Sequence, residues 1–151
     1  MVGTAVTVQT RRGDNLAILR AYDFCRPGDV MVVDAGGDVS NALVGGIMTL
    51  GATSLGLAGM VLDGAIRDVA EIRQRSFPVY ARGVTHRGPY KDGPGAINVP
   101  ITVGGMPVNR GRHHRRGSGR APRIPTVPGC NGHRESTGSG AKGTRYHPRN
   151  P

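Results

Sequence analysis

The sequence contains no tryptophan, and its 151 residues include only two phenylalanines and four tyrosines. Proteins that hold single-stranded nucleic acid commonly stack the bases on aromatic side chains. This scarcity argues against a nucleic-acid partner, although the formal net charge is +10. The charge is also uneven, because residues 109–151 carry +9 of it and residues 1–108 carry only +1. The main body of the chain is therefore close to neutral.

Cysteine is scarce as well, since the chain has only Cys25 and Cys130. Two cysteines make no disulfide framework, and no Cys-x-x-Cys spacing suggests a zinc site. No apolar run approaches the ~18 residues of a membrane span, and the first residues lack the basic-then-apolar order of a secretion signal. These absences predict a cytoplasmic protein without a membrane partner.

The composition changes at Asn109. Residues 109–151 are rich in Gly, Pro, Arg and His, so they bury too little apolar surface to offset the entropy of ordering. We therefore expect one α/β domain over residues 1–108 and a disordered basic tail over residues 109–151. A nucleic-acid-binding tail and a metal site at His113 and His114 are weaker alternatives, because aromatic interleaving is almost absent and no ligand spacing is present.

Strands alternate with helices within residues 1–108, and a β-rich end follows. Apolar and β-branched runs predict strands at 2–10, 30–34, 59–63 and 77–81, and a hairpin formed by 97–103 and 104–108. Apolar spacing predicts a helix capped by Asn15, a helix that begins at 45–48, and a helix over 69–75. This order of elements is typical of a three-layer α/β domain.

The range 41–72 is the expected functional centre. Backbone N–H groups are free where a loop enters a helix, and such a helix start binds anions. In this range the loop-to-helix positions are Gly45, Gly46, Ile47 and Met48. The strand at 59–63 should bring Arg67 and Asp68 to the sheet edge at which α/β proteins bind ligands. The pattern predicts one small site for an anion and a metal, and a plain ion pair between Arg67 and Asp68 is the alternative.

Six segments between residues 27 and 108 carry a family resemblance. They are PGDVMVVDAGG (27–37), NALVGG (41–46), GMVLDGAIRDVAEI (59–72), VYARG (79–83), KDGPGAINVPI (91–101) and GGMPV (104–108). In these segments the chain resembles the RraA-like family. That family includes regulators of ribonuclease E activity, and divalent-metal-dependent 4-hydroxy-4-methyl-2-oxoglutarate and 4-carboxy-4-hydroxy-2-oxoadipate aldolases. The resemblance implies a swivelling β/β/α domain that assembles as a homotrimer or hexamer.

The resemblance also implies candidate catalytic residues. Arg67 matches the arginine that holds the substrate, Asp68 matches the metal ligand, and Glu71 matches a trailing acid. The backbone N–H groups of residues 45–48 match the substrate-binding turn. Aldolases of the family carry an acid 21 positions before the arginine, where this chain has Gly46. The sequence therefore does not identify the group that transfers the proton.

These residue types fit one chemistry. A 2-oxo acid offers a carboxylate and a keto oxygen to Mg²⁺ (Mn²⁺ is the alternative ion), so the ion needs only one ligand from Asp68. The ion then acts as a Lewis acid while Arg67 binds the carboxylate in a bidentate fork. We expect a class II aldolase that releases pyruvate from 4-hydroxy-4-methyl-2-oxoglutarate-type 2-oxo acids and also decarboxylates oxaloacetate.

A second function stays open, namely a non-enzymatic regulator that binds and inhibits a ribonuclease. The regulator branch of the family commonly lacks the metal-ligand aspartate, and this chain retains it as Asp68. The resemblance therefore favours the enzyme over the regulator.

The resemblance stops after GGMPV, where the family continues with a Pro-Gly-Asp turn and an apolar strand. This chain has Gly111-Arg112-His113-His114-Arg115-Arg116 instead. The codons GGG CGA CAT CAT CGT CGG would encode these residues, and one nucleotide later they encode Gly-Asp-Ile-Ile-Val-Gly. Our hypothesis is that the tail is a frameshifted reading of the usual C-terminal strands. The nucleotide sequence that encodes residues 109–151 tests this hypothesis.

Overall fold

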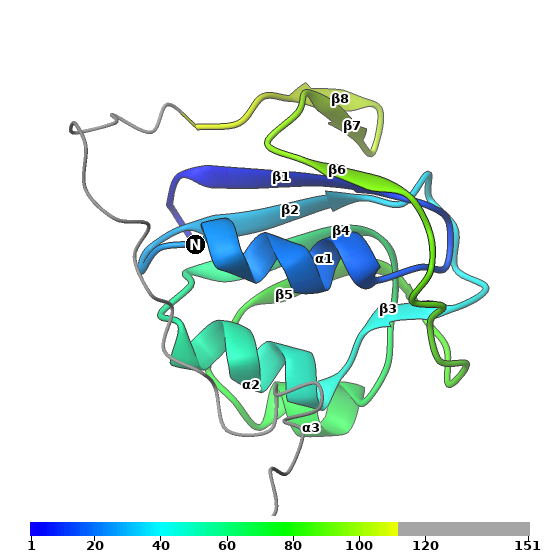
Figure 1. Ribbon diagram of the computed structural model, residues 1–151. Coiled ribbons are helices and arrows are strands. Elements are labelled where there is room, and N and C mark those ends of the chain that lie inside the picture. The colour runs from blue at the N-terminus through cyan, green and yellow to red at the C-terminus, as the bar shows by residue number, and fades with distance from the viewer. Residues whose placement is uncertain (112–151) are drawn as a thin grey trace, which may run out of the picture.

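The computed structural model describes residues 1–111, so the expected tail from residue 112 onward lies outside the described residues. Its centre is a six-stranded sheet with the strand order β3-β4-β2-β1-β6, and β5 also pairs with β4 (Figure 1). The pairs are parallel except for β1 with β6. The six strands are β1 (Ala5–Thr10), β2 (Val30–Asp34), β3 (Ala42–Val44), β4 (Gly59–Ile66), β5 (Val79–Val84) and β6 (Gly95–Ile97).

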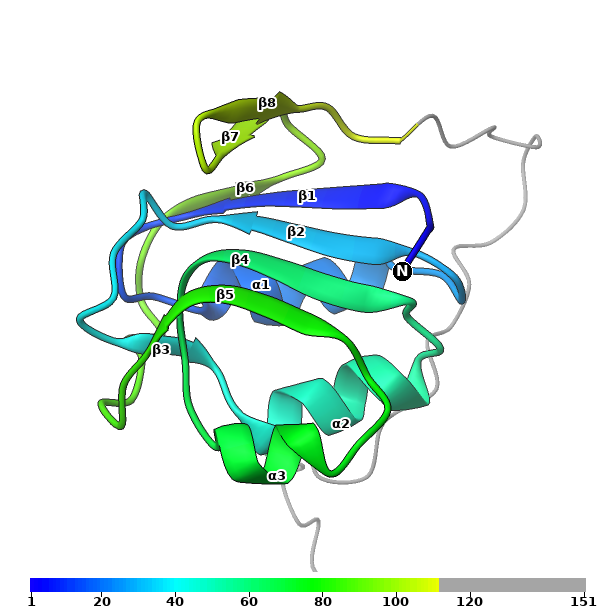
Figure 2. The same ribbon diagram turned by 180° about the vertical axis from the view of Figure 1, so that it is seen from behind.

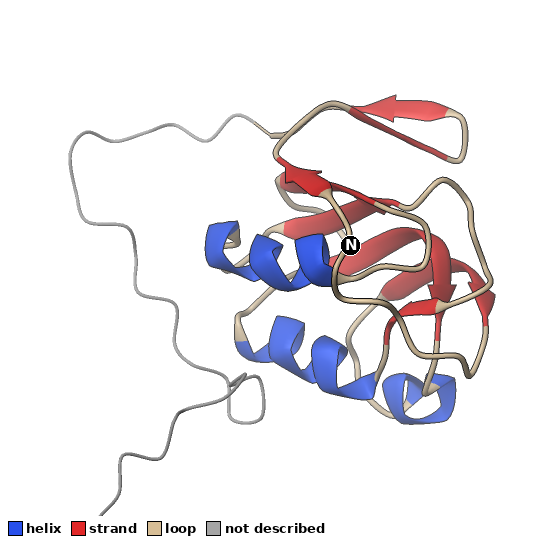
Figure 3. Cartoon of the chain, turned by 45° about the vertical axis from the view of Figure 1, so that its right-hand side comes forward, coloured by secondary structure: helices blue, strands red, loops and turns tan. Residues whose placement is uncertain are grey.

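Helices lie on one face of this sheet and a β-hairpin lies on the other (Figures 2 and 3). The helices are α1 (Leu16–Ala21), which continues into the 3-10 helix η1 (Tyr22–Phe24), α2 (Gly46–Ser54) and α3 (Val69–Arg73). The hairpin consists of β7 (Ile101–Val103) and β8 (Met106–Val108). Helices, sheet and hairpin form the three layers, so the α/β fold class predicted from the sequence is confirmed for the described residues.

Successive side chains along a strand point to opposite faces of the sheet, so the apolar side chains form two separate clusters. Side chains that face the helices form the larger core, which includes Val6, Val8, Met31, Val33, Met60 and Leu62. Val30 and Val32 face the other way and pack against Ile101 of the hairpin. Strand β2 is therefore covered on both faces, which explains why its sequence is a continuous apolar run.

Two aspartates that pair across neighbouring strands hold the hairpin, Asp34 at the end of β2 and Asp63 within β4. The Asp34 carboxylate accepts the N–H of Thr102 at 3.3 Å, and the Asp63 carboxylate accepts the N–H of Gly104 at 3.2 Å. Asp63 also accepts a hydrogen bond from Arg82 Nε at 2.6 Å. These contacts give Asp34 and Asp63 a structural role in holding the hairpin against the sheet.

Strand β4 is longer than the predicted strand at 59–63. Its last two residues, Ala65 and Ile66, pair with β3 on one side and with β5 on the other. Strand β3 lies in a segment that was expected to be a loop, and it is only three residues long. Strand β5 runs over 79–84 where 77–81 was predicted. The extension of β4 carries the chain directly to Arg67, one of the candidate site residues.

Other boundaries differ from the sequence-based expectations for identifiable reasons. The predicted strand at 97–103 is two strands, since β6 pairs with β1 and β7 pairs with β8. Asn98 breaks the run with a left-handed φ of 61°. Asn15 does not cap α1 with its side chain. Asp14 accepts the N–H of Leu16 at 2.9 Å instead, and Asn15 donates to the Leu43 carbonyl at 3.0 Å.

Across residues 1–111, we find no helix with the length and apolar character that a membrane span requires.

Candidate functional site

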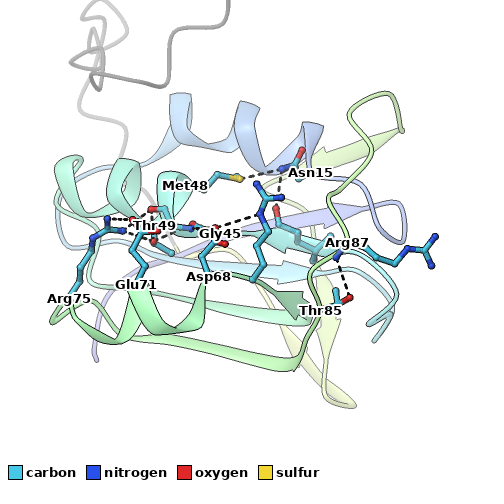
Figure 4. A network of polar contacts seen from close by, with 12 residues as sticks. Asn15, Gly45, Met48, Thr49, Asp68, Glu71, Arg75, Thr85 and Arg87 are labelled. Carbon is cyan, nitrogen blue, oxygen red and sulfur yellow. Dashed lines mark hydrogen bonds and ion pairs between the residues drawn. The ribbon is translucent and has the colours of Figure 1, made fainter.

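The candidate site forms where the end of β4 meets the start of α2. Strand β4 ends at Ile66, and Arg67 and Asp68 follow before α3 begins. Asp68 adopts a left-handed conformation, with φ 56° and ψ 36°. This turn directs its carboxylate back toward α2, where Oδ2 accepts the N–H of Gly46 at 2.9 Å (Figure 4). A non-glycine residue in this conformation costs about 1–2 kcal/mol, which the surrounding contacts must offset.

Gly45 is required by the closeness of this approach. A Cβ atom on Gly45 would lie 2.5 Å from Asp68 Oδ2 and 2.9 Å from Arg67 Nε. The absence of a side chain at this position therefore lets the side chains of Arg67 and Asp68 reach the first turn of α2.

The ion pair between Arg67 and Asp68, expected as the plain alternative, is present but loose. Arg67 Nε lies 3.5 Å from Asp68 Oδ2, and the two side chains are 43% and 41% exposed. An ion pair this exposed contributes little to stability. Both groups are therefore accessible to a ligand, and their pairing leaves room for a second role.

The first turn of α2 offers two backbone donors to that ligand. The first helical hydrogen bond runs from the Thr49 N–H to the Gly45 carbonyl at 3.1 Å, so the N–H groups of Ile47 and Met48 precede it. The Ile47 side chain is exposed, while Met48 is half-buried and its sulfur contacts Asn15 Nδ2 at 3.3 Å. The expectation that Gly46 also offers a free N–H was wrong, because Asp68 accepts it.

Glu71 of α3 and Arg75, which lies two residues after α3 ends, complete this cluster. Arg75 donates to Glu71 Oε1, to the Gly46 carbonyl at 2.8 Å and to Thr49 Oγ1 at 3.4 Å (Figure 4). Sequence analysis selected Glu71 and missed Arg75. The four-residue spacing of Glu71 and Arg75, which places two side chains on one face of a helix, was the available signal.

A loop over residues 85–93 borders the site on another side. The Arg87 carbonyl accepts the N–H of Ala42 at 2.8 Å, and the Gly88 carbonyl accepts the Asn41 side chain at 2.6 Å. A Cβ atom on Gly88 would lie 3.5 Å from Arg67 Nη1, so this loop runs beside the arginine.

Asp14 holds the far end of that loop. Its carboxylate is fully buried and accepts the N–H groups of Asp92 at 2.9 Å and Gly93 at 2.7 Å. Burial by itself would raise the pKa of Asp14. The effect of burial is outweighed by these two N–H groups, the Leu16 N–H and the Arg11 guanidinium, so the pKa of Asp14 lies below its usual range. Asp14 is therefore an ionised anchor for the loop at neutral pH.

The donor set allows one carboxylate ligand for a metal ion. Within residues 1–111, no group of three or more His, Cys, Asp or Glu side chains comes together to hold a metal. Asp68 uses Oδ2 to accept the Gly46 N–H, which leaves Oδ1 for an ion. Mg²⁺ is commonly bound through one or two carboxylates together with substrate oxygens and waters. Asp68 therefore fits such an ion, with the remaining ligands coming from outside the protein.

A comparison with protein families gives the context for this geometry. The model of the family described as RraA-like (Aldolase/RraA) matches residues 1–113. The chain belongs to the RraA-like family. The match ends within a few residues of Asn109, where the composition changes.

Curated RraA-like relatives carry aldolase names. A Halalkalibacterium halodurans protein, provisionally named a 4-hydroxy-4-methyl-2-oxoglutarate aldolase, is 48% identical over 111 residues, which are 74% of this chain and 53% of that protein. The 4-hydroxy-4-methyl-2-oxoglutarate aldolase of Thermus thermophilus is 35% identical over 63% of this chain and 58% of its own length. The chain thus spans little more than half the length of these two relatives.

Solved structures of the family include RNA-processing regulators. The RNA-processing inhibitor RraA from Thermus thermophilus superposes with a TM-score of 0.68 at 33% identity, covering 72% of this chain and 66% of that one. RraAS2 of Streptomyces coelicolor, described as an unusual member of the RNase ES inhibitor family, gives 0.63 at 31% identity, covering 72% and 57%. The swivelling RraA-like fold is thereby confirmed, while the family itself includes both aldolase and inhibitor names.

Proposed function

We propose that this protein is a divalent-metal-dependent class II aldolase that cleaves 4-hydroxy-4-methyl-2-oxoglutarate-type 2-oxo acids to pyruvate, with oxaloacetate decarboxylation as a side activity. The observation that carries the proposal is the position of Asp68. Its carboxylate is partly exposed at the open start of α2, directly beside the Arg67 guanidinium. The aldolase names of the curated relatives support the same reaction class.

Each residue has a role in this proposal. Arg67 binds the substrate carboxylate through its planar guanidinium, which suits bidentate recognition. The N–H groups of Ile47 and Met48 bind a second substrate oxygen, helped by the positive end of the α2 dipole. Asp68 would hold Mg²⁺ or Mn²⁺ through Oδ1, and the bound ion would supply Lewis-acid polarisation of the keto group. The loop over 85–93 limits the room beside Arg67.

The active assembly in this proposal is a homotrimer or hexamer. Residues 1–151 span little more than half the length of the two curated relatives, so the test uses this chain itself. Sedimentation of the purified chain measures the assembly directly, and a monomer at micromolar concentration would contradict this part of the proposal.

The test of the activity is pyruvate release from 4-hydroxy-4-methyl-2-oxoglutarate and from oxaloacetate, with Mg²⁺ and with a chelator. We expect release with Mg²⁺, none with the chelator, and none from Asp68→Ala. Asp23→Asn, which changes an exposed acid on η1, is the matched control. A protein that is folded by circular dichroism yet releases no pyruvate would overturn the proposal.

A ribonuclease regulator is the second candidate, and the RraA structures of Thermus and Streptomyces favour it. Such a protein should inhibit an E-type ribonuclease without any metal. Cleavage of a model RNA by that ribonuclease, measured in chelator with and without this chain, separates the two candidates.

A further inference from the structure

Arg75 holds a backbone carbonyl on the first turn of α2, although it lies beyond the end of α3. Its Nη1 atom donates to the Gly46 carbonyl at 2.8 Å and to Thr49 Oγ1 at 3.4 Å. The Thr49 side chain is fully buried, and its hydroxyl donates to the same Gly46 carbonyl at 2.9 Å. Two side-chain donors therefore converge on one backbone oxygen.

The stability of α2 does not explain an arginine in this place. The start of a helix carries a partial positive charge, so a cation beside it is unfavourable. The ion pair with Glu71 offsets that repulsion, but it requires no contact with α2. The Arg75 side chain is 26% exposed, and its backbone N–H donates to the Ile72 carbonyl at 3.1 Å, so the guanidinium is held where it is. The contact with the Gly46 carbonyl therefore needs another explanation.

Gly46 is the residue of this turn that most needs support from outside the helix. Gly45 and Gly46 follow each other at the helix start, and glycine loses more backbone freedom on ordering than any other residue. Asp68 accepts the Gly46 N–H, and Arg75 donates to the Gly46 carbonyl, so the peptide groups on both sides of this glycine are held (Figure 4). The Ile47 N–H, which precedes the first hydrogen bond of the helix, is left for a ligand.

The peptide group between Gly46 and Ile47 connects Arg75 to that ligand. In a planar trans peptide the C=O and N–H bonds point in opposite directions, and none of the peptide bonds in the described residues is cis. Fixing the Gly46 oxygen therefore also fixes the direction of the Ile47 N–H. A charged donor on the oxygen polarises the amide as well, which makes its N–H a stronger donor.

We infer that Arg75 is a positioning residue, which directs and polarises the Ile47 N–H toward an anionic oxygen of the ligand by holding the Gly46 carbonyl. The inference rests on the proposed function only for the identity of that ligand, a 2-oxo acid. Arg75 itself touches no substrate atom in this role. That distinguishes it from Arg67, which binds the substrate carboxylate directly.

Oxalate is a suitable probe, because it is a planar anion whose oxygens are arranged like those of a pyruvate enolate. Calorimetry of the full chain with oxalate and Mg²⁺ measures its Kd. In Arg75→Met, we expect this Kd and the KM for 4-hydroxy-4-methyl-2-oxoglutarate to rise about tenfold. The kcat should change less than about threefold, because the contact binds substrate and transition state alike. Arg75→Lys should recover part of the affinity, and Arg73→Met, on the exposed side of α3, is the matched control.

The Ile47 amide provides a readout that a purely structural role would not move. With isotope-labelled isoleucine, its amide proton should shift upfield in Arg75→Met, because the peptide group loses polarisation. The amide of Ile66, at the end of β4, should keep its position. If Arg75 only links α3 to α2, Arg75→Met should unfold at a lower temperature while the oxalate affinity and the Ile47 signal of the folded protein stay unchanged.

A double-mutant cycle tests whether Arg75 acts through the Gly46 carbonyl. Thr49→Val removes the other side-chain donor to that oxygen and keeps the size of the side chain. We expect Thr49→Val to weaken oxalate binding less than Arg75→Met does, and the two effects should not add. Additive effects would mean that Arg75 acts elsewhere.

The outcomes distinguish this inference from the proposed function. Pyruvate release by the wild-type protein, with the oxalate affinity and the Ile47 signal unchanged in Arg75→Met, would overturn the role of Arg75 and leave the aldolase intact. Oxalate binding that weakens in Arg75→Met, in a folded protein that releases no pyruvate, would overturn the aldolase and support the role of Arg75. A folded wild-type protein that does not bind oxalate would overturn the inference.

Discussion

The carboxylate of Asp68 accepts the backbone N–H of Gly46, and this single 2.9 Å bond joins the end of β4 to the first turn of α2. It forms because Asp68 adopts a left-handed backbone that turns the side chain back along the strand. The left-handed backbone of Asp68 and its hydrogen bond to Gly46 thus depend on each other. Substitutions of Asp68 should therefore reveal both the lost carboxylate and the backbone strain.

Asp68→Gly and Asp68→Ala should both abolish the proposed metal-dependent activity, because each removes the carboxylate. They should differ in stability, since alanine keeps the left-handed strain and glycine does not. We expect Asp68→Gly to be about 1 kcal/mol more stable than Asp68→Ala in urea unfolding. Equal stability of the two variants would show that φ at this position relaxes when the carboxylate is lost.

Asp14 predicts a pH dependence of stability. Its pKa is lowered in the folded protein, so its stabilising contribution is complete above the unfolded pKa of about 3.9 and is lost as the pH falls through the folded value. Asp14→Asn should lower the free energy of unfolding by about 1–3 kcal/mol at pH 7. The difference in unfolding free energy between the wild-type protein and Asp14→Asn should become smaller below about pH 4. Urea titrations between pH 7 and pH 3 measure this difference. A difference that stays constant across this range would contradict a lowered pKa for Asp14.

Cys25 should be chemically inert in the folded protein. Burial, together with the nearby charge of Asp29, raises the pKa of its thiol to about 12, and its sulfur contacts the Ala21 carbonyl at 3.3 Å. The thiolate is the reactive form, so it is almost absent at pH 8. In a Cys130→Ser variant, we expect a disulfide reagent to label the protein only after denaturant is added. Rapid labelling of the native variant would mean that α1 opens readily.

Asp63 should stabilise the β7–β8 hairpin and have little effect on the candidate site. Its carboxylate accepts bonds from Arg82 and from the N–H of Gly104, so Asp63→Ala leaves both donors without it. We expect faster amide hydrogen exchange in β7 and β8 and a loss of about 1–3 kcal/mol in stability. Exchange at the Gly46 amide should be unchanged, and a change there would place Asp63 in the functional site.

The sequence predicted the parts of the fold that have a clear apolar pattern. The run at 30–34 is covered on both faces and was assigned correctly. Strand β4 was cut short because Asp63 and Gly64 resemble a turn. In the structure Arg82 and Gly104 bind Asp63, and Gly64 leaves room for Leu43. These partners are distant in sequence, so no local pattern could have revealed them.

The candidate site shows the same limit. The sequence predicted that Arg67, Asp68 and Glu71 belong to one site, and in the structure all three lie beside the first turn of α2. It could not show that Asp68 consumes the Gly46 N–H, because that bond depends on a left-handed turn at a non-glycine residue. It also missed Arg75, whose contacts with Gly46 and Thr49 arise only when α3 packs beside α2.

Strand β4 is hydrogen-bonded on both sides over most of its length, to β2 and then β3 along one edge and to β5 along the other. Such a strand opens only when the domain unfolds as a whole. Arg67 and Asp68 follow it directly, so heat should abolish the proposed activity and unfold the protein over the same temperature range. Any loss of activity below the unfolding transition would then originate in the loop over residues 85–93, which the side chains of Asp14 and Asn41 hold against the domain.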